Sequence, residues 1–103
     1  MTSKQRAYLK SLAMTMDSIL QIGKSVVTPE LTKSVDEALE ARELIKIHVL
    51  KNCVANPKEI AILLAERTHA EVVQVIGRKI VLYRHNSKKK DGIELPKAKQ
   101  AKE

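Results

Sequence analysis

Two strand-length apolar runs are each followed, after a short loop, by a signal for the start of a helix. The first run is residues 18–22 (SILQI), and Thr28-Pro29 opens the helix after it. The second run is residues 44–50 (LIKIHVL), with Asn56-Pro57 in the equivalent place. Threonine and asparagine accept hydrogen bonds from free helical N–H groups, and proline suits the first helical position. The strand–helix order predicts parallel strands joined by right-handed crossovers.

The rest of the chain completes one small domain. Apolar periodicity predicts helices near residues 3–14, 28–42 and 56–70, and β-branched residues predict strands over 72–76 and 79–84. Gly77-Arg78 between these last strands predicts a type II′ hairpin. We therefore expect an α/β fold with the order α-β-α-β-α-β-β, in which helices pack against a mixed four-stranded sheet. We assign residues 1–85 to this single compact domain and residues 86–103 to a basic, flexible tail.

The charge of the chain favours a polyanionic partner. The formal net charge is +7, and the domain is basic without its tail, with 13 Lys and Arg against 9 Asp and Glu in residues 1–85. Such a balance is most often associated with nucleic acid, although a soluble basic protein without that partner has the same composition. No apolar run approaches the ~18 residues of a membrane span. With no secretory signal and a single cysteine, we expect a cytoplasmic protein.

Residues 22–25 (IGKS) resemble the end of a phosphate-binding P-loop, but the rest of that motif is missing. Ser18 stands where its first glycine belongs, and the run before Gly23 has the pattern of a buried strand. A P-loop needs bare backbone amides at those positions, and it needs a strand that ends in aspartate to hold magnesium. We therefore expect no nucleotide site and no cofactor.

The same turn suits an anion in another way. Gly23 permits a tight turn or a close backbone approach, Lys24 can reach a phosphate, and Ser25 offers a hydroxyl. The helix that starts near Thr28 adds the partial positive charge of its N-terminus. An ordinary strand-to-helix turn with an exposed lysine also fits these residues.

Other candidate chemical groups are scattered along the chain. The three histidines share no metal-ligand spacing with one another or with Cys53, so we expect no metal site and no catalytic centre. The acids near the second helix are expected to form a solvated face: Asp36, Glu37, Glu40 and Glu43. The only aromatic residues are Tyr8 and Tyr83. Because splayed bases usually stack on aromatic rings, we expect any RNA contact to be made mainly to phosphates, sugars and overall shape.

Four segments together resemble the CRM domain, in its stand-alone bacterial form, the YhbY family of RNA-binding proteins. They are KQRAYLKSLA, ILQIGK, ALEARELIKIHVL and VVQVIGRKIVLYR, and the resemblance covers about residues 3–85. It implies a fold similar to the C-terminal domain of translation initiation factor three. It also implies association with precursors of the large ribosomal subunit and no catalytic chemistry.

The marker of this family is a G-x-x-G loop after the first strand. The resemblance places it at Gly23-Lys24-Ser25-Val26, where Val26 replaces the second glycine. A β-branched residue disfavours positive φ, at a cost of about 1–2 kcal/mol, so a close backbone approach at this position is in doubt. Further cations are expected to extend the RNA-binding surface: Arg6, Lys10, Lys46, Arg78, Lys79 and Arg84. Arg84 is the weakest of these, because an acid of the domain could pair with it.

We therefore expect a monomeric, non-enzymatic RNA-binding protein that assists assembly of the large ribosomal subunit. Its partner would be ribosomal RNA or the precursor particle, with no membrane and no small-molecule substrate. The alternative is a protein-interaction module that docks its basic face on acidic ribosomal or assembly partners.

Overall fold

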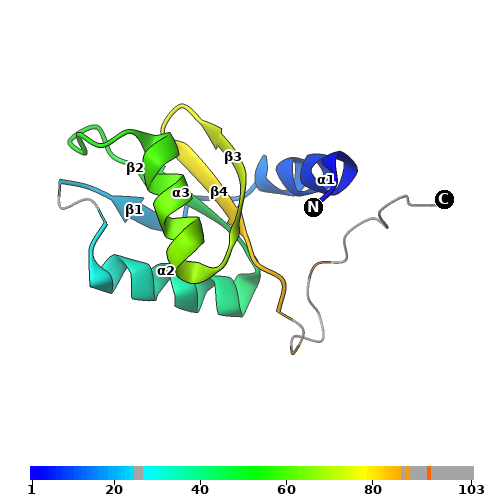
Figure 1. Ribbon diagram of the computed structural model, residues 1–103. Helices are drawn as coiled ribbons and strands as arrows, with labels where there is room; N and C mark the ends of the chain where they lie inside the picture. Colours follow the sequence, from blue (N-terminus) through cyan, green and yellow to red (C-terminus); the bar gives the residue numbers. More distant parts are fainter. Residues whose placement is uncertain (25–26, 87, 89–92, 94–103) are drawn as a thin grey trace.

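The computed structural model describes residues 1–24, 27–86, 88 and 93. Within them lie the helices α1 (Ser3–Ala13), α2 (Pro29–Arg42) and α3 (Pro57–Thr68) (Figure 1). The strands are β1 (Leu20–Ile22), β2 (Leu44–Val49), β3 (Glu71–Ile76) and β4 (Lys79–Tyr83). The predicted order and the mixed four-stranded sheet are confirmed. The predicted roles of Ser25 and Val26 lie outside the described residues.

Each helix begins at a side chain that accepts a hydrogen bond from the first turn. Thr2 Oγ1 accepts from the N–H of Gln5 at 3.1 Å, and Gln5 Oε1 accepts from the N–H of Thr2 at 3.0 Å. Thr28 Oγ1 accepts from the N–H of Leu31 at 3.0 Å, and Asn56 Oδ1 accepts from that of Lys58 at 2.8 Å. These caps confirm the helix starts that the sequence predicts.

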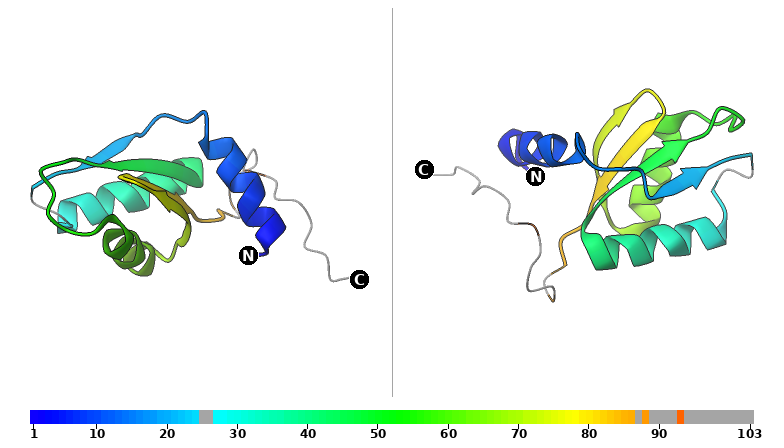
Figure 2. Two further views of the ribbon diagram at one scale, coloured as in Figure 1. Left: turned by 90° about the horizontal axis from the view of Figure 1, so that it is seen from above. Right: turned by 180° about the vertical axis from the view of Figure 1, so that it is seen from behind.

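The strand order in the sheet is β1-β2-β4-β3. β1 is parallel to β2, and β4 is antiparallel to both of its neighbours. β1, β2 and β3 therefore run in one direction, and their C-terminal ends lie at one edge of the sheet (Figure 2). The loops after β1 and β2 and the turn after β3 are thereby brought to the same edge.

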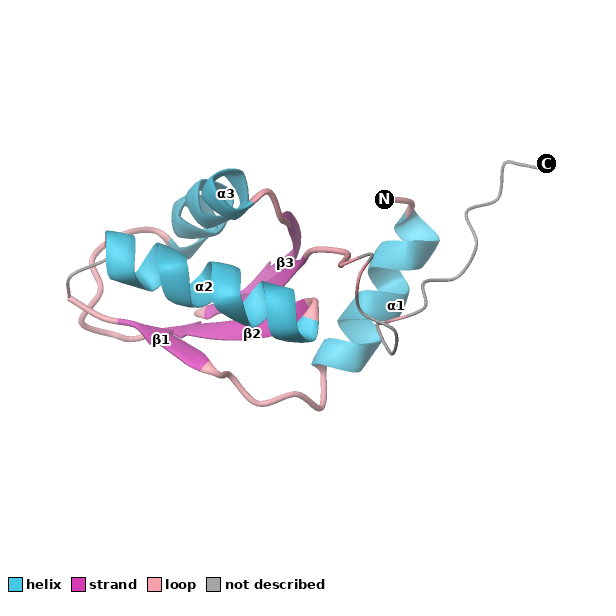
Figure 3. Cartoon of the chain, turned by 90° about the horizontal axis from the view of Figure 1, so that it is seen from below, coloured by secondary structure: helices cyan, strands magenta, loops and turns pink. Residues whose placement is uncertain are grey.

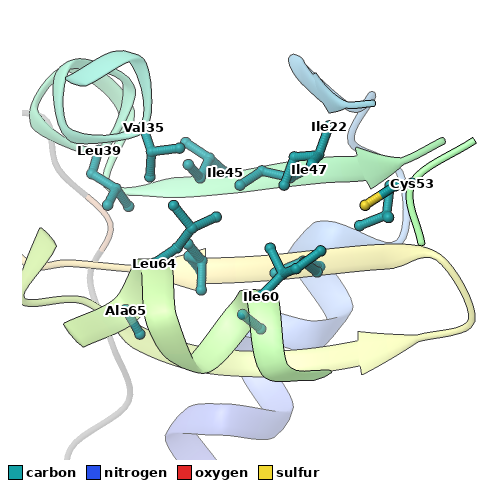
Figure 4. Close-up of a cluster of buried hydrophobic side chains, with 13 residues drawn as sticks. Ile22, Val35, Leu39, Ile45, Ile47, Cys53, Ile60, Leu64 and Ala65 are labelled. Atoms are coloured by element: carbon teal, nitrogen blue, oxygen red, sulfur yellow. The ribbon is translucent and has the colours of Figure 1, made fainter. Parts of the chain in front are cut away.

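The two faces of the sheet are covered unequally. α2 and α3 pack on one face, over a core that includes Ile22, Val35, Leu39, Ile47 and Leu64 (Figures 3 and 4). α1 packs on the opposite face in a smaller cluster, formed by Leu9, Ala13, Leu44, Val73, Val81 and Tyr83. Figure 3 shows α1 toward one end of the sheet, away from the loop between β1 and α2. Part of this second face is left without a helix over it.

The β3–β4 connection is the predicted two-residue hairpin. Ile76 lies opposite Lys79, and Gly77 has a left-handed φ of 56°. Arg78 is not among the residues with positive φ, as expected for the second position of a type II′ turn. A register shift between Val72 and Gln74 places a bulge at Val73.

Glu43 departs from the prediction of a solvated acidic face. Asp36, Glu37 and Glu40 are exposed as predicted, but Glu43 has none of its surface exposed. It follows α2 with a left-handed φ of 65°, and this bend turns the chain directly into β2. The tertiary fold therefore buries a carboxylate that the helical pattern had assigned to solvent.

The chain after β4 supplies the partners of this buried carboxylate. Glu43 Oε2 accepts from the N–H of Asn86 at 2.7 Å, and Oε1 accepts from the N–H of Ile93 at 2.6 Å. The His85 Nδ1 atom lies 3.4 Å from Oε2. Ile93 is half-buried against the α1 cluster. Asn86 and Ile93 of the predicted tail thus contact the domain, and most of residues 86–103 lies outside the described part of the chain.

Candidate nucleic-acid interface

The loops that follow β1 and β2 lie side by side. The N–H of Leu50 donates to the carbonyl of Ile22 at 2.8 Å, so the two strands stay paired to their ends. The first loop leads to the N-terminus of α2 at Thr28, and the second leads to that of α3 at Asn56. Free N–H groups and the helix dipole make each N-terminus favourable for an anion. The fold therefore places two helix N-termini beyond the same edge of the sheet.

The β3–β4 hairpin is joined to this edge by Arg78. The N–H of Val49 donates to the carbonyl of Arg78 at 2.7 Å, and Arg78 Nη1 donates to the carbonyl of Leu50 at 3.0 Å. The Arg78 side chain is held beside the loop after β2 while the residue stays exposed. Its guanidinium has further donors that remain available for a ligand.

Four cations gather at this edge on the two loops, the first turn of α3 and the hairpin. We call them the basic edge: Lys24, Lys51, Lys58 and Arg78, all of which are exposed. Glu30 and Glu59 are the acids in the first turns of α2 and α3. The structure thus brings together Lys24 and Arg78, two of the residues that the sequence predicts to contact RNA.

Lys51 and Lys58 are absent from the sequence-based prediction. Lys51 follows the end of β2 by two residues, just as Lys24 follows the end of β1 by two residues. Because parallel strands end at one edge of their sheet, this shared offset places both lysines there. The offset was the signal that could have identified Lys51 from the sequence.

Gly23 does not need to be glycine for its own backbone. Its φ is not left-handed, since Gly77 is the glycine with positive φ. A Cβ atom at Gly23 would meet Asn52 Oδ1 at 3.5 Å and Leu50 Cδ1 at 3.7 Å, which are ordinary contacts. Of the two roles suggested by the sequence, a turn that demands positive φ is absent. Close approach by a ligand stays a prediction.

Changing Gly23 to alanine is expected to separate folding from binding. Because the conformation and the space both admit a methyl group, the free energy of unfolding should stay the same or rise by up to about 1 kcal/mol. RNA affinity should fall if a phosphate approaches the Gly23 backbone. Urea unfolding and RNA titration of the same sample measure the two effects. A marked loss of stability would show that the glycine serves the fold.

Two other predicted cations, Arg6 and Lys46, have partners inside the domain. Arg6 Nη1 donates to the carbonyls of Val72 and Val73 at the bulge of β3. Lys46 Nζ donates to the carbonyls of Ala13 and Met16 at 3.0 and 3.3 Å, at the C-terminal end of α1. Both side chains therefore hold α1 against the sheet. Contact between either of them and RNA stays a prediction.

Arg84 joins β4 to the two helices on the main core face. Its guanidinium lies 2.6 Å from Asp36 Oδ1 and 3.2 Å from Glu40 Oε1, and it donates to the carbonyl of Thr68 at 2.7 Å. The expected internal pairing with an acid is thus present. The carboxylates are more than half exposed, so solvent weakens these ion pairs.

Lys10 and Lys79 are exposed but lie outside the basic edge. Lys10 is on α1, which packs on the other side of the sheet from α2 and α3. Lys79 is opposite His48 near the end of β2, one residue from Arg78. Lys79 therefore links the basic edge to the sheet face that α1 leaves open.

Two other kinds of feature are absent from the described part of the chain. No group of three or more His, Cys, Asp and Glu side chains there could hold a metal ion. No described helix has the length and apolar character needed to cross a membrane.

The fold and this surface define a small α/β module with cations and helix N-termini at the ends of its parallel strands. The chain belongs to the CRS1/YhbY (CRM) domain family, whose model matches residues 1–84. This confirms the resemblance seen in the sequence.

Similar proteins cover nearly the whole chain. A Bacillus subtilis protein named "Probable RNA-binding protein YqeI" is 43% identical over 96 residues, which are 93% of this chain and 99% of that protein. A Haemophilus influenzae protein named "RNA-binding protein" is 31% identical over 97 residues, which are 94% of this chain and 96% of that protein. The solution structure of SAV1595 from Staphylococcus aureus, a candidate RNA-binding protein, matches with a TM-score of 0.78 and 50% identity. That match covers 93% of this chain and 99% of the other.

Proposed function

We propose that this protein binds RNA, without catalysing a reaction, through the basic edge. The observation that supports this most is the meeting of two strand-end loops, two helix N-termini and the hairpin arginine at one edge of the sheet. Lysine and arginine there would neutralise phosphates, and the helix N-termini would face the same backbone. The names of similar proteins from two bacteria, which call them RNA-binding proteins, point the same way.

The finer proposal is that the RNA is ribosomal and that the protein assists assembly of the large subunit in the cytoplasm. It acts as a monomer and needs no cofactor, membrane or small-molecule substrate. Support comes from membership of the CRS1/YhbY family and from the resemblance of the sequence to its bacterial members. Crosslinking in cells, followed by sequencing of the attached RNA, tests this. Enrichment of messenger or transfer RNA without ribosomal RNA would exclude the assembly role.

Replacing Lys24 by alanine tests the proposed contact with RNA. Loss of one phosphate contact should weaken binding to structured ribosomal RNA and reduce the salt slope of log K by about one unit. Arg67→Ala is the matched control, because Arg67 is an exposed cation in the last turn of α3, far along that helix from its N-terminus. If both variants bind with the affinity and slope of the unaltered protein, Lys24 is not a phosphate contact.

The alternative is a protein-interaction module whose basic face meets acidic ribosomal or assembly partners. In that case purified RNA would bind weakly and with the same affinity for Lys24→Ala and Arg67→Ala. The salt titration therefore separates the two functions with one pair of variants.

A further inference from the structure

The face of the sheet that carries α1 has a part with no helix over it. The strand register places Gln21, His48, Lys79 and Ile76 in one row across the sheet, one residue from each strand. The next row contains Lys46, Val81 and Gln74. α1 packs on Val81 of this second row and on residues beyond it, including Leu44 and Tyr83. Figure 2 shows, in its right-hand view, the strands facing the reader with α1 to one side of them.

A groove of about 240 Å³ lies where this open face meets the end of α1. Its walls include Met14 and Ile76, which are 77% and 61% exposed, and the buried residues Val81 and Ala13 are part of its lining. Large exposed apolar side chains that face a shared hollow favour the binding of an apolar surface. Sites for drug-sized molecules span ~300–1,000 Å³, so this groove suits a single flat ring system.

The polar groups of the groove are suited to a nucleotide. The side-chain amide of Gln74 has no hydrogen-bond partner among the described residues, and it offers both a donor and an acceptor. The exposed ammonium of Lys79 likewise has no described ion-pair partner. Lys46 also lines the groove, but its ammonium donates to the carbonyls of Ala13 and Met16. The free polar groups are therefore one amide and one cation.

The position of the groove favours RNA over a protein segment. Lys79 follows Arg78 of the basic edge directly, so a nucleic-acid strand bound at that edge can continue onto the open face. An amide can pair with the edge of a base through two hydrogen bonds, while apolar side chains cover the faces of the ring. A partner helix would need a longer apolar groove than this one.

We propose that this groove binds one unstacked base of the RNA, with Met14 and Ile76 against the ring, Gln74 at its hydrogen-bonding edge and Lys79 at its phosphate. The inference rests on the proposed RNA-binding function and adds sequence discrimination to it. The basic edge provides affinity for any backbone, and the groove distinguishes one base from another.

The test uses four hairpin RNAs that share one stem and have loops of only A, only C, only G or only U. A fifth RNA is the stem alone, as a blunt duplex. The unaltered protein should prefer one loop. Gln74→Ala should lower the affinity for that loop by about tenfold and reduce the differences in affinity among the four hairpins. Its affinity for the duplex should not change. Gln21→Ala is the control, because Gln21 lies on the same face, at the far side of the first row, and outside the groove.

Photocrosslinking gives a second measurement that does not depend on a substitution. A photoreactive analogue of the preferred base, placed in its loop, should attach to a residue of the groove, and mass spectrometry of the peptides identifies that residue. Attachment only at Lys24, Lys51 or Arg78, or unchanged loop preference in Gln74→Ala, would overturn the groove as a base site. In either of those cases Lys24→Ala would still lower the affinity of the protein for all of the RNAs, so the proposed function would stand.

Two other outcomes overturn the inference differently. If the unaltered protein binds neither the hairpins nor the duplex, the proposed function itself fails and the groove proposal fails with it. If sedimentation finds a dimer that Ile76→Glu abolishes while loop preference is kept, the groove is an interface between two copies. Circular dichroism of each variant verifies that the fold is retained.

Discussion

Replacing Lys24, Lys51 and Arg78 together by glutamine is expected to lower the affinity for structured RNA on the order of 100-fold. These residues lie on three separate segments that the sheet brings to one edge. Each phosphate that a cation neutralises contributes about 0.7–0.9 to the salt slope, so the slope should fall by about 2–3 units. Filter binding or fluorescence anisotropy over a range of salt concentrations measures both quantities.

The matched control removes three exposed cations from elsewhere in the fold, namely Lys4, Arg42 and Arg67. The two triple variants have the same net charge, so a general loss of electrostatic attraction would weaken both of them equally. A specific basic edge predicts a much larger loss for the first variant. Equal losses would show that binding is spread over the whole surface and would contradict the proposed interface.

Replacing Glu43 by alanine is expected to lower the free energy of unfolding by about 3 kcal/mol. The variant leaves the N–H groups of Asn86 and Ile93 without the carboxylate that accepts from both. Hydrogen bonds to charged groups contribute about 1.5–3 kcal/mol each, and water can replace part of that at the edge of the domain. Urea denaturation of the full chain measures the change.

A glycine variant separates the carboxylate from the backbone at this position. Glu43 has a φ of 65°, which disfavours any side chain and favours glycine. Glu43→Gly should therefore be more stable than Glu43→Ala by about 1 kcal/mol while still being less stable than the unaltered protein. If Glu43→Ala and Glu43→Gly lower the free energy of unfolding equally, the positive φ at residue 43 does not destabilise the protein.

Tyr83 provides a spectroscopic measure of the Glu43 charge. Burial, followed by the negative charges of Glu43 and Glu71, raises the pKa of the Tyr83 phenol above its usual value of 10.0. Glu43→Gln should lower that pKa toward 10.0, and alkaline titration of tyrosine absorbance reads this, with Tyr8 as the other chromophore. The pKa of Tyr83 is higher in the folded protein than in the unfolded chain. The contribution of this shift to stability is therefore present below pH 10 and is lost as the pH rises through the folded pKa.

Much of the fold could be predicted from local sequence patterns. The caps at Thr28 and Asn56, the hairpin at Gly77 and the alternation of β2 each depend on residues a few positions apart. The start of α1 at Thr2 follows the same rule through its capping box with Gln5. Hydrogen bonds of this kind form within one or two turns, so neighbouring residues are enough to specify them.

The candidate site could be predicted only in part. The sequence predicts Lys24 and Arg78 as members of the candidate site, whereas Lys51 and Lys58 are absent from that prediction. Arg6 and Lys46 have the same formal charge as Lys24, yet their donors are used by carbonyls of β3 and α1. Those acceptors lie 33 to 67 positions away in the chain. No local pattern indicates which cations have such distant partners.

The sequence by itself determined the elements, their order and the family, because these depend on short-range periodicity, capping and recognisable segments. The tertiary structure alone decided the strand order β1-β2-β4-β3, the burial of Glu43 and the meeting of Lys24, Lys51 and Arg78 at one edge. It also decided which part of the sheet α1 leaves open. The physical reason is that packing and pairing join residues far apart in the chain, and their neighbours in space set their burial, charge and accessibility.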